Sequence, residues 1–165
     1  MESTSKNSTK EQLWKLMETV YDPEIPALSV IDLGIIRDIQ IHDKEIEIII
    51  TPTYSGCPAM DVISMNIRMA FIKEGLTPIK ISQQLSPAWT TDWMTETGKQ
   101  KLKSYGIAPP AAKIFDETYL ENLVVECPLC HLQNTRLISQ FGSTACKALY
   151  QCNDCKEPFD YFKCH

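Results

Sequence analysis

The sequence predicts an α+β protein in two parts: a small α-β-β-α-β-α sandwich domain followed by a C-terminal zinc ribbon. Two observations support this prediction. The first 106 residues alternate between helix-like and strand-like hydrophobic periods, and six of the seven cysteines fall in the last 39 residues. We therefore expect a flexible tail at 1–8, the sandwich domain at 9–106, a linker at 107–123 and the ribbon at 124–165.

Local signals delimit the elements of the first domain. Ser8 with Glu11 and Thr9 with Gln12 both have the spacing of a capping box, so either pair can open the first helix, which Asp22-Pro23 ends. Pro58 suits the first position of a second helix, which places Cys57 at its N-cap. The remaining elements are a β-hairpin over 35–51, a third strand over 78–85 and a third helix over 91–105.

Composition excludes several classes of protein. Hydrophobic residues make up 44% and charged residues 22% of the 165 residues, which is typical of a folded globular chain. The net charge of −5 disfavours nucleic acid as a partner. No apolar run approaches the roughly 18 residues that span a bilayer, and the polar start has no signal-peptide core. We expect no membrane partner and a cytoplasmic location.

The strongest chemical signal is a pair of Cys-x-x-Cys motifs. Cys127 and Cys130 form the first motif, and Cys152 and Cys155 form the second, with 21 residues between the two motifs. Four thiolates close a tetrahedral shell and leave no position open for water, so the predicted metal is structural. Zinc is favoured over iron, which thiolate cages also hold. The metal would also stabilise a segment that is too short to fold on its apolar surface alone.

The other cysteine, histidine and aromatic residues of the ribbon give weaker signals. We expect Cys146, Cys164, His131 and His165 not to be metal ligands. Cys146 is either a packed small side chain or a thiol exposed by the preceding Gly-Ser-Thr turn. The aromatic side chains of Phe159, Tyr161 and Phe162 suit either a protein contact or the core of the ribbon. Charges in the ribbon nearly balance, which again disfavours nucleic acid.

Cys57 is the second chemical signal. A helix N-terminus favours the thiolate form, so this residue is a candidate for metal handling, with an inert buried thiol as the alternative. Asp22 and Glu24 lie on a rigid turn that could face the Cys57 loop, although a solvated turn has the same pattern. Trp89 and Trp93 are expected in the core.

Several motifs resemble those of a known family. Tyr21-Asp22-Pro23-Glu24-Ile25-Pro26, Asp32-Leu33-Gly34 and Gly56-Cys57-Pro58 are similar to the marks of the MIP18 family of iron–sulfur assembly domains. Later phrases resemble one branch of that family, the D components of phenylacetyl-CoA epoxidase systems. These phrases include Ser86-Pro87-Ala88-Trp89, Gly106-Ile107-Ala108-Pro109-Pro110 and Glu157-Pro158-Phe159-Asp160.

The resemblance implies an accessory protein of a multicomponent monooxygenase in phenylacetate catabolism, not catalytic by itself. Its partners would be the oxygenase and reductase subunits, and a homodimer is a further arrangement. Its role would be to help mature iron or iron–sulfur centres, with Cys57 as the candidate iron or cluster ligand and Asp22 and Glu24 beside it. The alternative is a structural or adaptor subunit in which Cys57 only packs.

Overall fold

The computed structural model describes residues 8–43, 45–110 and 118–163. These residues form two compact units. The first contains the described residues up to Trp89 together with Trp93–Thr95, and the second contains Thr90–Asp92 and the described residues from Glu96 onward. Most of the predicted tail, the middle of the predicted linker, Cys164 and His165 lie outside the described residues.

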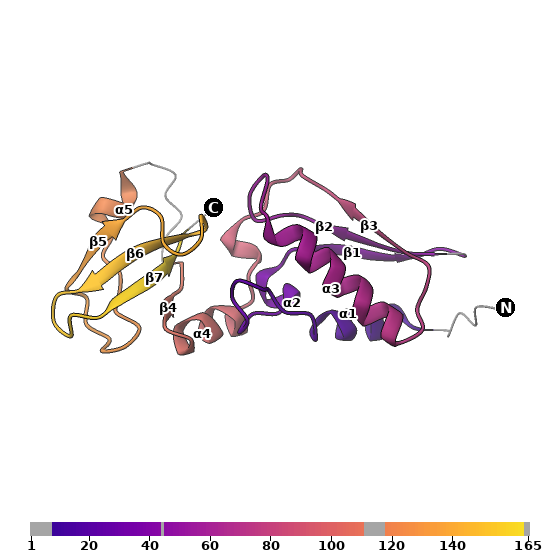
Figure 1. Ribbon diagram of the computed structural model, residues 1–165, viewed down its shortest axis with the longest axis horizontal. Coiled ribbons are helices and arrows are strands. Elements are labelled where there is room, and N and C mark those ends of the chain that lie inside the picture. Colours follow the sequence, from indigo (N-terminus) through magenta and orange to yellow (C-terminus); the bar gives the residue numbers. More distant parts are fainter. Residues whose placement is uncertain (1–7, 44, 111–117, 164–165) are drawn as a thin grey trace. The chain divides into compact units, whose positions relative to one another are not determined.

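The first unit contains a three-stranded sheet in the order β1-β2-β3 (Figure 1). The predicted hairpin is present: β1 (Ile36–Ile41) pairs antiparallel with β2 (Ile46–Ile50). β3 (Ile79–Gln83) pairs with β2 in parallel. Because parallel neighbours need a long crossover, the chain between them forms the helix α3 (Ala59–Lys73). The third predicted strand and the second predicted helix are thereby confirmed.

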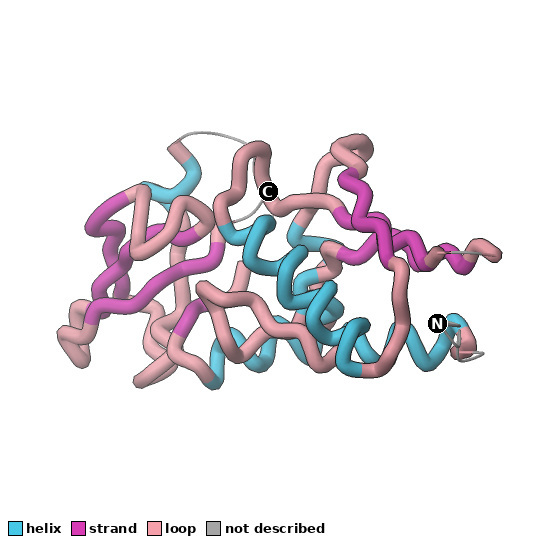
Figure 2. The backbone as a smooth tube through the Cα atoms, turned by 45° about the vertical axis from the view of Figure 1, so that its right-hand side comes forward, coloured by secondary structure: helices cyan, strands magenta, loops and turns pink. Residues whose placement is uncertain are grey.

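Both long helices of this unit lie on one face of its sheet, as Figures 1 and 2 show. α1 (Lys10–Met17) begins with the predicted capping box, in which the Gln12 N–H donates to the Thr9 hydroxyl and the Thr9 N–H to the Gln12 side chain. Between helices and sheet lies an aliphatic and aromatic core of fully buried side chains. It includes Leu13, Met17, Ile39, Ile48, Ile50, Ile67 and Phe71.

A short helix, α2 (Val30–Leu33), is not among the predicted elements. It carries its own capping box: the Asp32 N–H donates to the Ser29 hydroxyl, and the Ser29 N–H donates to the Asp32 carboxylate. Gly34 ends it with φ +69°. The Ser-x-x-Asp spacing followed by glycine is visible in the sequence, so this helix could have been predicted from local signals.

The segment around the two tryptophans packs onto the end of α2. The Trp89 indole N–H donates to the Leu33 carbonyl (2.9 Å), and the Thr95 hydroxyl donates to the Asp32 carboxylate (3.0 Å). A Cβ on Gly34 would lie 2.0 Å from the Trp93 carbonyl oxygen. Trp89 is buried, as expected. Trp89 and Trp93–Thr95 thus pack against Asp32 and Gly34 within the first unit.

The second unit contains a four-stranded sheet in the order β4-β7-β6-β5. Its helices are α4 (Glu96–Ser104) and α5 (Tyr119–Asn122), and its strands are β4 (Ile107–Ala108), β5 (Thr135–Ser139), β6 (Lys147–Cys152) and β7 (Pro158–Phe162). The single helix predicted over 91–105 is divided into a 3-10 turn, η1 (Thr91–Trp93), and α4.

The grouping of the middle segment differs from the predicted domain boundaries. The predicted boundary assigns α4 to the first domain, whereas α4 and β4 belong to the second unit. The reason is a non-local pairing, since β4 lies parallel to β7 with Ile107 opposite Asp160 and Ala108 opposite Tyr161. β4 and α5 also show that part of the predicted linker has regular structure.

The core of the second unit is small and aromatic. Phe159, Tyr161 and Phe162 are all buried, which supports the interpretation of these residues as the ribbon's own core and not as a docking strand. Tyr150 lies between Phe159 and Tyr161, with ring centroids 6.0 and 5.7 Å away. Its hydroxyl donates to the Leu120 carbonyl at 2.6 Å, which ties α5 to the sheet.

Candidate metal centre and the Cys57 loop

The two Cys-x-x-Cys segments fold into matching knuckles. In the first, the Cys127 N–H donates to the Leu132 carbonyl at 2.9 Å, and in the second the Cys152 N–H donates to the Glu157 carbonyl at 3.1 Å. The residue after each second cysteine has positive φ, 63° at His131 and 68° at Lys156. This left-handed residue reverses the chain so that both cysteines of a knuckle point to one centre.

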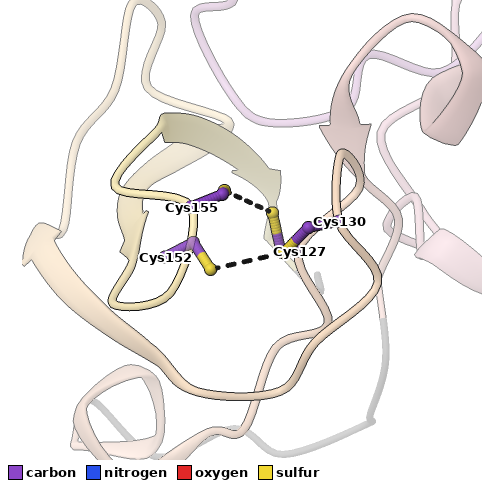
Figure 3. A group of neighbouring side chains, drawn as sticks. All are labelled: Cys127, Cys130, Cys152 and Cys155. Atoms are coloured by element: carbon purple, nitrogen blue, oxygen red, sulfur yellow. Dashed lines mark hydrogen bonds between the residues drawn. The ribbon is translucent and has the colours of Figure 1, made fainter.

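The four sulfur atoms of Cys127, Cys130, Cys152 and Cys155 converge (Figure 3). All lie within 4.8 Å of one another, with Cys127 Sγ 3.8 Å from Cys155 Sγ and Cys130 Sγ 3.5 Å from Cys152 Sγ. A tetrahedron with metal–sulfur bonds of about 2.3 Å has sulfur atoms about 3.8 Å apart. The geometry therefore fits one tetrahedral metal ion held by all four cysteines.

The surroundings of the sulfurs favour negative charge unequally. The N–H groups of Cys155 and Asp154 donate to Cys152 and lower its pKa to about 7 despite its burial. The N–H of Leu132 likewise favours the thiolate of Cys130, but burial and the neighbouring thiols outweigh it and raise the Cys130 pKa. Four adjacent thiols do not all ionise by themselves, so a cation is needed to hold them as thiolates.

The other metal-binding residue types of the ribbon lie outside this centre. Nδ1 of His131 is 3.2 Å from a Glu126 carboxylate oxygen, which also receives Lys103 Nζ at 2.7 Å. Cys146 is buried, with its sulfur 3.0 Å from the Thr144 hydroxyl oxygen. This supports the packed interpretation of Cys146 over the exposed one. Cys164 and His165 cannot be placed, because they lie outside the described residues.

Cys57 directly precedes the N-cap of α3 and does not occupy it. The N-cap of α3 is Pro58, with helical φ and ψ of −68° and −21°, and no side chain caps this end. The prediction that Cys57 is the N-cap is therefore wrong by one position, because the proline ring already adopts the helical φ. The Met60 N–H still donates to the Cys57 carbonyl at 3.2 Å, so the half-buried Cys57 adjoins the first turn.

The Asp22 carboxylate has a structural function in its own loop. Its Oδ1 accepts the N–H groups of Glu24 (2.7 Å) and Ile25 (2.8 Å). The Asp22 N–H donates to the Leu28 carbonyl at 2.8 Å, which closes the turn. Asp22 is buried, whereas Glu24 is partly exposed. Asp22 therefore shapes the turn that presents Glu24.

Within the described residues, the only group of three or more Cys, His, Asp or Glu side chains able to share a metal ion is the four-cysteine centre. Cys57, Asp22 and Glu24 are thus not gathered into such a group. Their joint role stays a prediction. A search of the same residues also finds no helix that is long and apolar enough to cross a bilayer.

Two family models match the two units. Residues 10–74 match the family described as iron–sulfur cluster assembly protein, and residues 113–163 match the PaaD zinc beta ribbon domain. A domain of unknown function, DUF59, from Bacillus anthracis covers 61% of this chain and 97% of its own length, with a TM-score of 0.54 at 22% identity. A conserved hypothetical protein of Thermotoga maritima covers 60% of this chain and 98% of its own, with a TM-score of 0.51 at 31% identity.

The chain belongs to the MIP18 (DUF59) family of iron–sulfur cluster assembly proteins, in the branch that ends in a PaaD zinc ribbon. One relative, from Escherichia coli, is provisionally named as the D component of 1,2-phenylacetyl-CoA epoxidase. It is 48% identical over 153 residues, which span 93% of this chain and 92% of the relative. An Fe-S protein maturation auxiliary factor of Porphyromonas gingivalis is 35% identical over 96 residues, 57% of this chain and 90% of its own.

Proposed function

We propose that this protein is an accessory subunit of a phenylacetyl-CoA epoxidase system and assists the maturation of iron or iron–sulfur centres in the oxygenase or reductase subunits. The observation that carries the proposal is the union, in one chain, of an iron–sulfur assembly domain with a PaaD zinc ribbon, in a sequence that is 48% identical to the Escherichia coli relative. The maturation factor that matches the first part of the chain supports the same role.

The four-cysteine centre and Cys57 have different roles in this proposal. The ribbon holds one zinc ion, since four thiolates satisfy its preferred tetrahedral geometry. With all four positions filled by protein, this ion has a structural role and exchanges no ligand with a partner's metal. Metal transfer therefore requires a thiol outside the ribbon, and Cys57, partly exposed at the start of α3, is that candidate. A single thiolate binds iron weakly enough to release it.

Glu24 is the carboxylate better suited to assist Cys57, because it is partly exposed, whereas Asp22 is buried and its carboxylate shapes its own turn. We therefore assign Asp22 a positioning role and Glu24 a ligating role. On this assignment Glu24→Gln lowers metal delivery, and Asp22→Asn lowers it only to the extent that the turn is disturbed.

The test is co-expression of the oxygenase and reductase subunits with the wild-type protein or Cys57→Ser. We expect the variant to retain its fold and one zinc per chain, while the partner subunits contain less iron and epoxidise phenylacetyl-CoA more slowly. Ser55→Ala, two residues away in the same exposed loop, is the matched control and should behave as wild type. Equal iron content and equal activity with Cys57→Ser would favour the adaptor alternative.

A further inference from the structure

The outer surface of α3 carries a continuous apolar stripe. Val62, Met65, Met69 and Ile72 are 44%, 64%, 50% and 52% exposed, and we call these four residues the α3 stripe. Their spacing of three, four and three residues is that of the seam between two paired helices. The opposite side of α3 is buried in the core of the first unit. The α3 stripe is therefore not part of the core of the first unit.

A groove beside the stripe extends this surface. It has a volume of about 570 Å³ and lies between α1 and the second half of α3, where Leu16, Val20 and Tyr21 face Met69 and Ala70. Isolated exposed apolar residues are ordinary, but four in register on one helix face, beside a groove with a mixed apolar and polar lining, are typical of an interaction surface. Methionine side chains adapt readily to such contacts.

The charged residues on either side of the α3 stripe favour one orientation of two paired α3 helices over the other. Asp61 and Arg68 are seven residues apart, so they lie on the same side of the stripe. Arg68 is held there by a hydrogen bond from its Nη1 to the Ile79 carbonyl at 3.2 Å. Asn66 and Lys73 are also seven residues apart and lie on the other side, towards the groove.

Parallel pairing of two such helices places opposite sides together and therefore brings Arg68 near Lys73, with repulsion between like charges. Antiparallel pairing about a two-fold axis places like sides together. In the register centred on Met65, each Asp61 lies within one residue, about 1.5 Å of helix rise, of the level of Arg68 in the other copy, and Val62 lies equally close to the level of Met69. The stripe is thus complementary to itself in one orientation, as an isologous interface requires.

We propose that the α3 stripe is the interface of an antiparallel homodimer with its two-fold axis at Met65. A helix of 15 residues is about 22 Å long and forms a smaller contact than a standard interface, so the dimer is expected at micromolar concentrations. The same register brings the end of each α3 beside the start of the other, where Cys57 lies. The inference stands independently of the proposed function, because it rests on α3 alone.

Analytical ultracentrifugation of the zinc-loaded full chain tests the interface. We expect a concentration-dependent dimer whose dissociation constant rises more than about tenfold in Met65→Glu, since two carboxylates would then face each other in an apolar contact. Leu85→Glu is the matched control: this residue is 62% exposed in the same unit but lies outside α3, and its variant should dimerise as wild type does.

A charge exchange tests the orientation. Asp61→Arg and Arg68→Asp should each weaken the dimer, because each places like charges together, and the double variant should restore it towards wild type. Both side chains are exposed, so we expect the fold to be kept with at most a small loss of stability from the lost hydrogen bond between Arg68 and the Ile79 carbonyl. A wild-type chain that stays monomeric up to about 1 mM, a dimer that survives Met65→Glu, or a double variant no stronger than the single variants would each overturn the proposal.

Discussion

The two units reach stability by different means. The first contains a core of aliphatic side chains drawn from two helices, a hairpin and a crossover strand, with no metal-ligand cluster among its described residues. The second packs a much smaller set around Tyr150 and Tyr161, and this set includes two of the four clustered cysteines, Cys127 and Cys152. Because a short segment has little apolar surface to bury, we expect the ribbon to depend on metal coordination where the first unit depends on packing.

This difference also separates the sites chemically. The ribbon centre is complete within one short segment, and its local knuckle geometry creates it. Cys57, in contrast, is a single thiol in a loop whose context depends on the folding of the whole first unit. A centre with four protein ligands suits a permanently bound structural ion, whereas a single thiol suits a metal that is bound only transiently.

Removal of the metal is the change with the largest expected effect, and it should act on one unit only. Cys152→Ser or strong chelation should unfold the ribbon and leave the first unit folded, because structural zinc contributes about 10 kcal/mol or more. Limited proteolysis and amide hydrogen exchange would report each unit separately. Cys146→Ser, which keeps all four ligands, is the control. Protection of the ribbon after metal removal would contradict its dependence on coordination.

Gly34→Ala should be the most damaging small substitution in the first unit. The new Cβ would lie 2.0 Å from the Trp93 carbonyl oxygen at a φ of +69°, so the Trp93 backbone must move away from Gly34. We expect the free energy of unfolding to fall by about 3 kcal/mol or more. Gly75→Ala has a similar φ of +73° but meets no atom within 4 Å, and should cost about 1 kcal/mol. Equal losses in denaturant titrations would exclude the steric explanation.

Tyr150→Phe tests the small core of the second unit at fixed metal content. The change removes the hydrogen bond to the Leu120 carbonyl and leaves that carbonyl without this donor in a buried site. The expected loss is about 1–2 kcal/mol in the unfolding free energy of the zinc-loaded ribbon. Tyr105→Phe, at a side chain that is 56% exposed, should have no measurable effect. A similar loss in both variants would argue against the bond between α5 and the sheet.

The smallest expected effect is a pH dependence confined to the first unit. Hydrogen bonds from Ser82, and then from Lys80, lower the pKa of Glu47 from 4.5 to about 2. Since the folded pKa is the lower one, this stabilisation is present above pH 4.5 and is lost as the pH falls towards 2. Glu47→Gln should flatten that part of the stability profile, and Glu45→Gln serves as the control. An unchanged slope between about pH 5 and pH 2 would contradict the assignment.

Local chemistry explains which features the sequence predicts. The capping box at Thr9, the hairpin, α3 and the existence of the third strand follow from hydrophobic periods and turn residues within a few positions. Each Cys-x-x-Cys knuckle was predictable for the same reason, because two residues between cysteines suffice to aim both sulfurs at one point, whereas the meeting of the two knuckles joins residues more than 20 positions apart. α2 was equally predictable, from Ser29, Asp32 and Gly34, although it was not among the predicted elements.

Contacts between residues that are distant in the sequence determine the features that local patterns do not predict. The burial of Tyr161 depends on strands that pair across a turn, and the placement of α4 and β4 with the ribbon depends on the pairing of Ala108 with Tyr161. Sequence patterns report which groups each segment offers, but only tertiary packing determines which of them meet, because those contacts join residues that no local period relates.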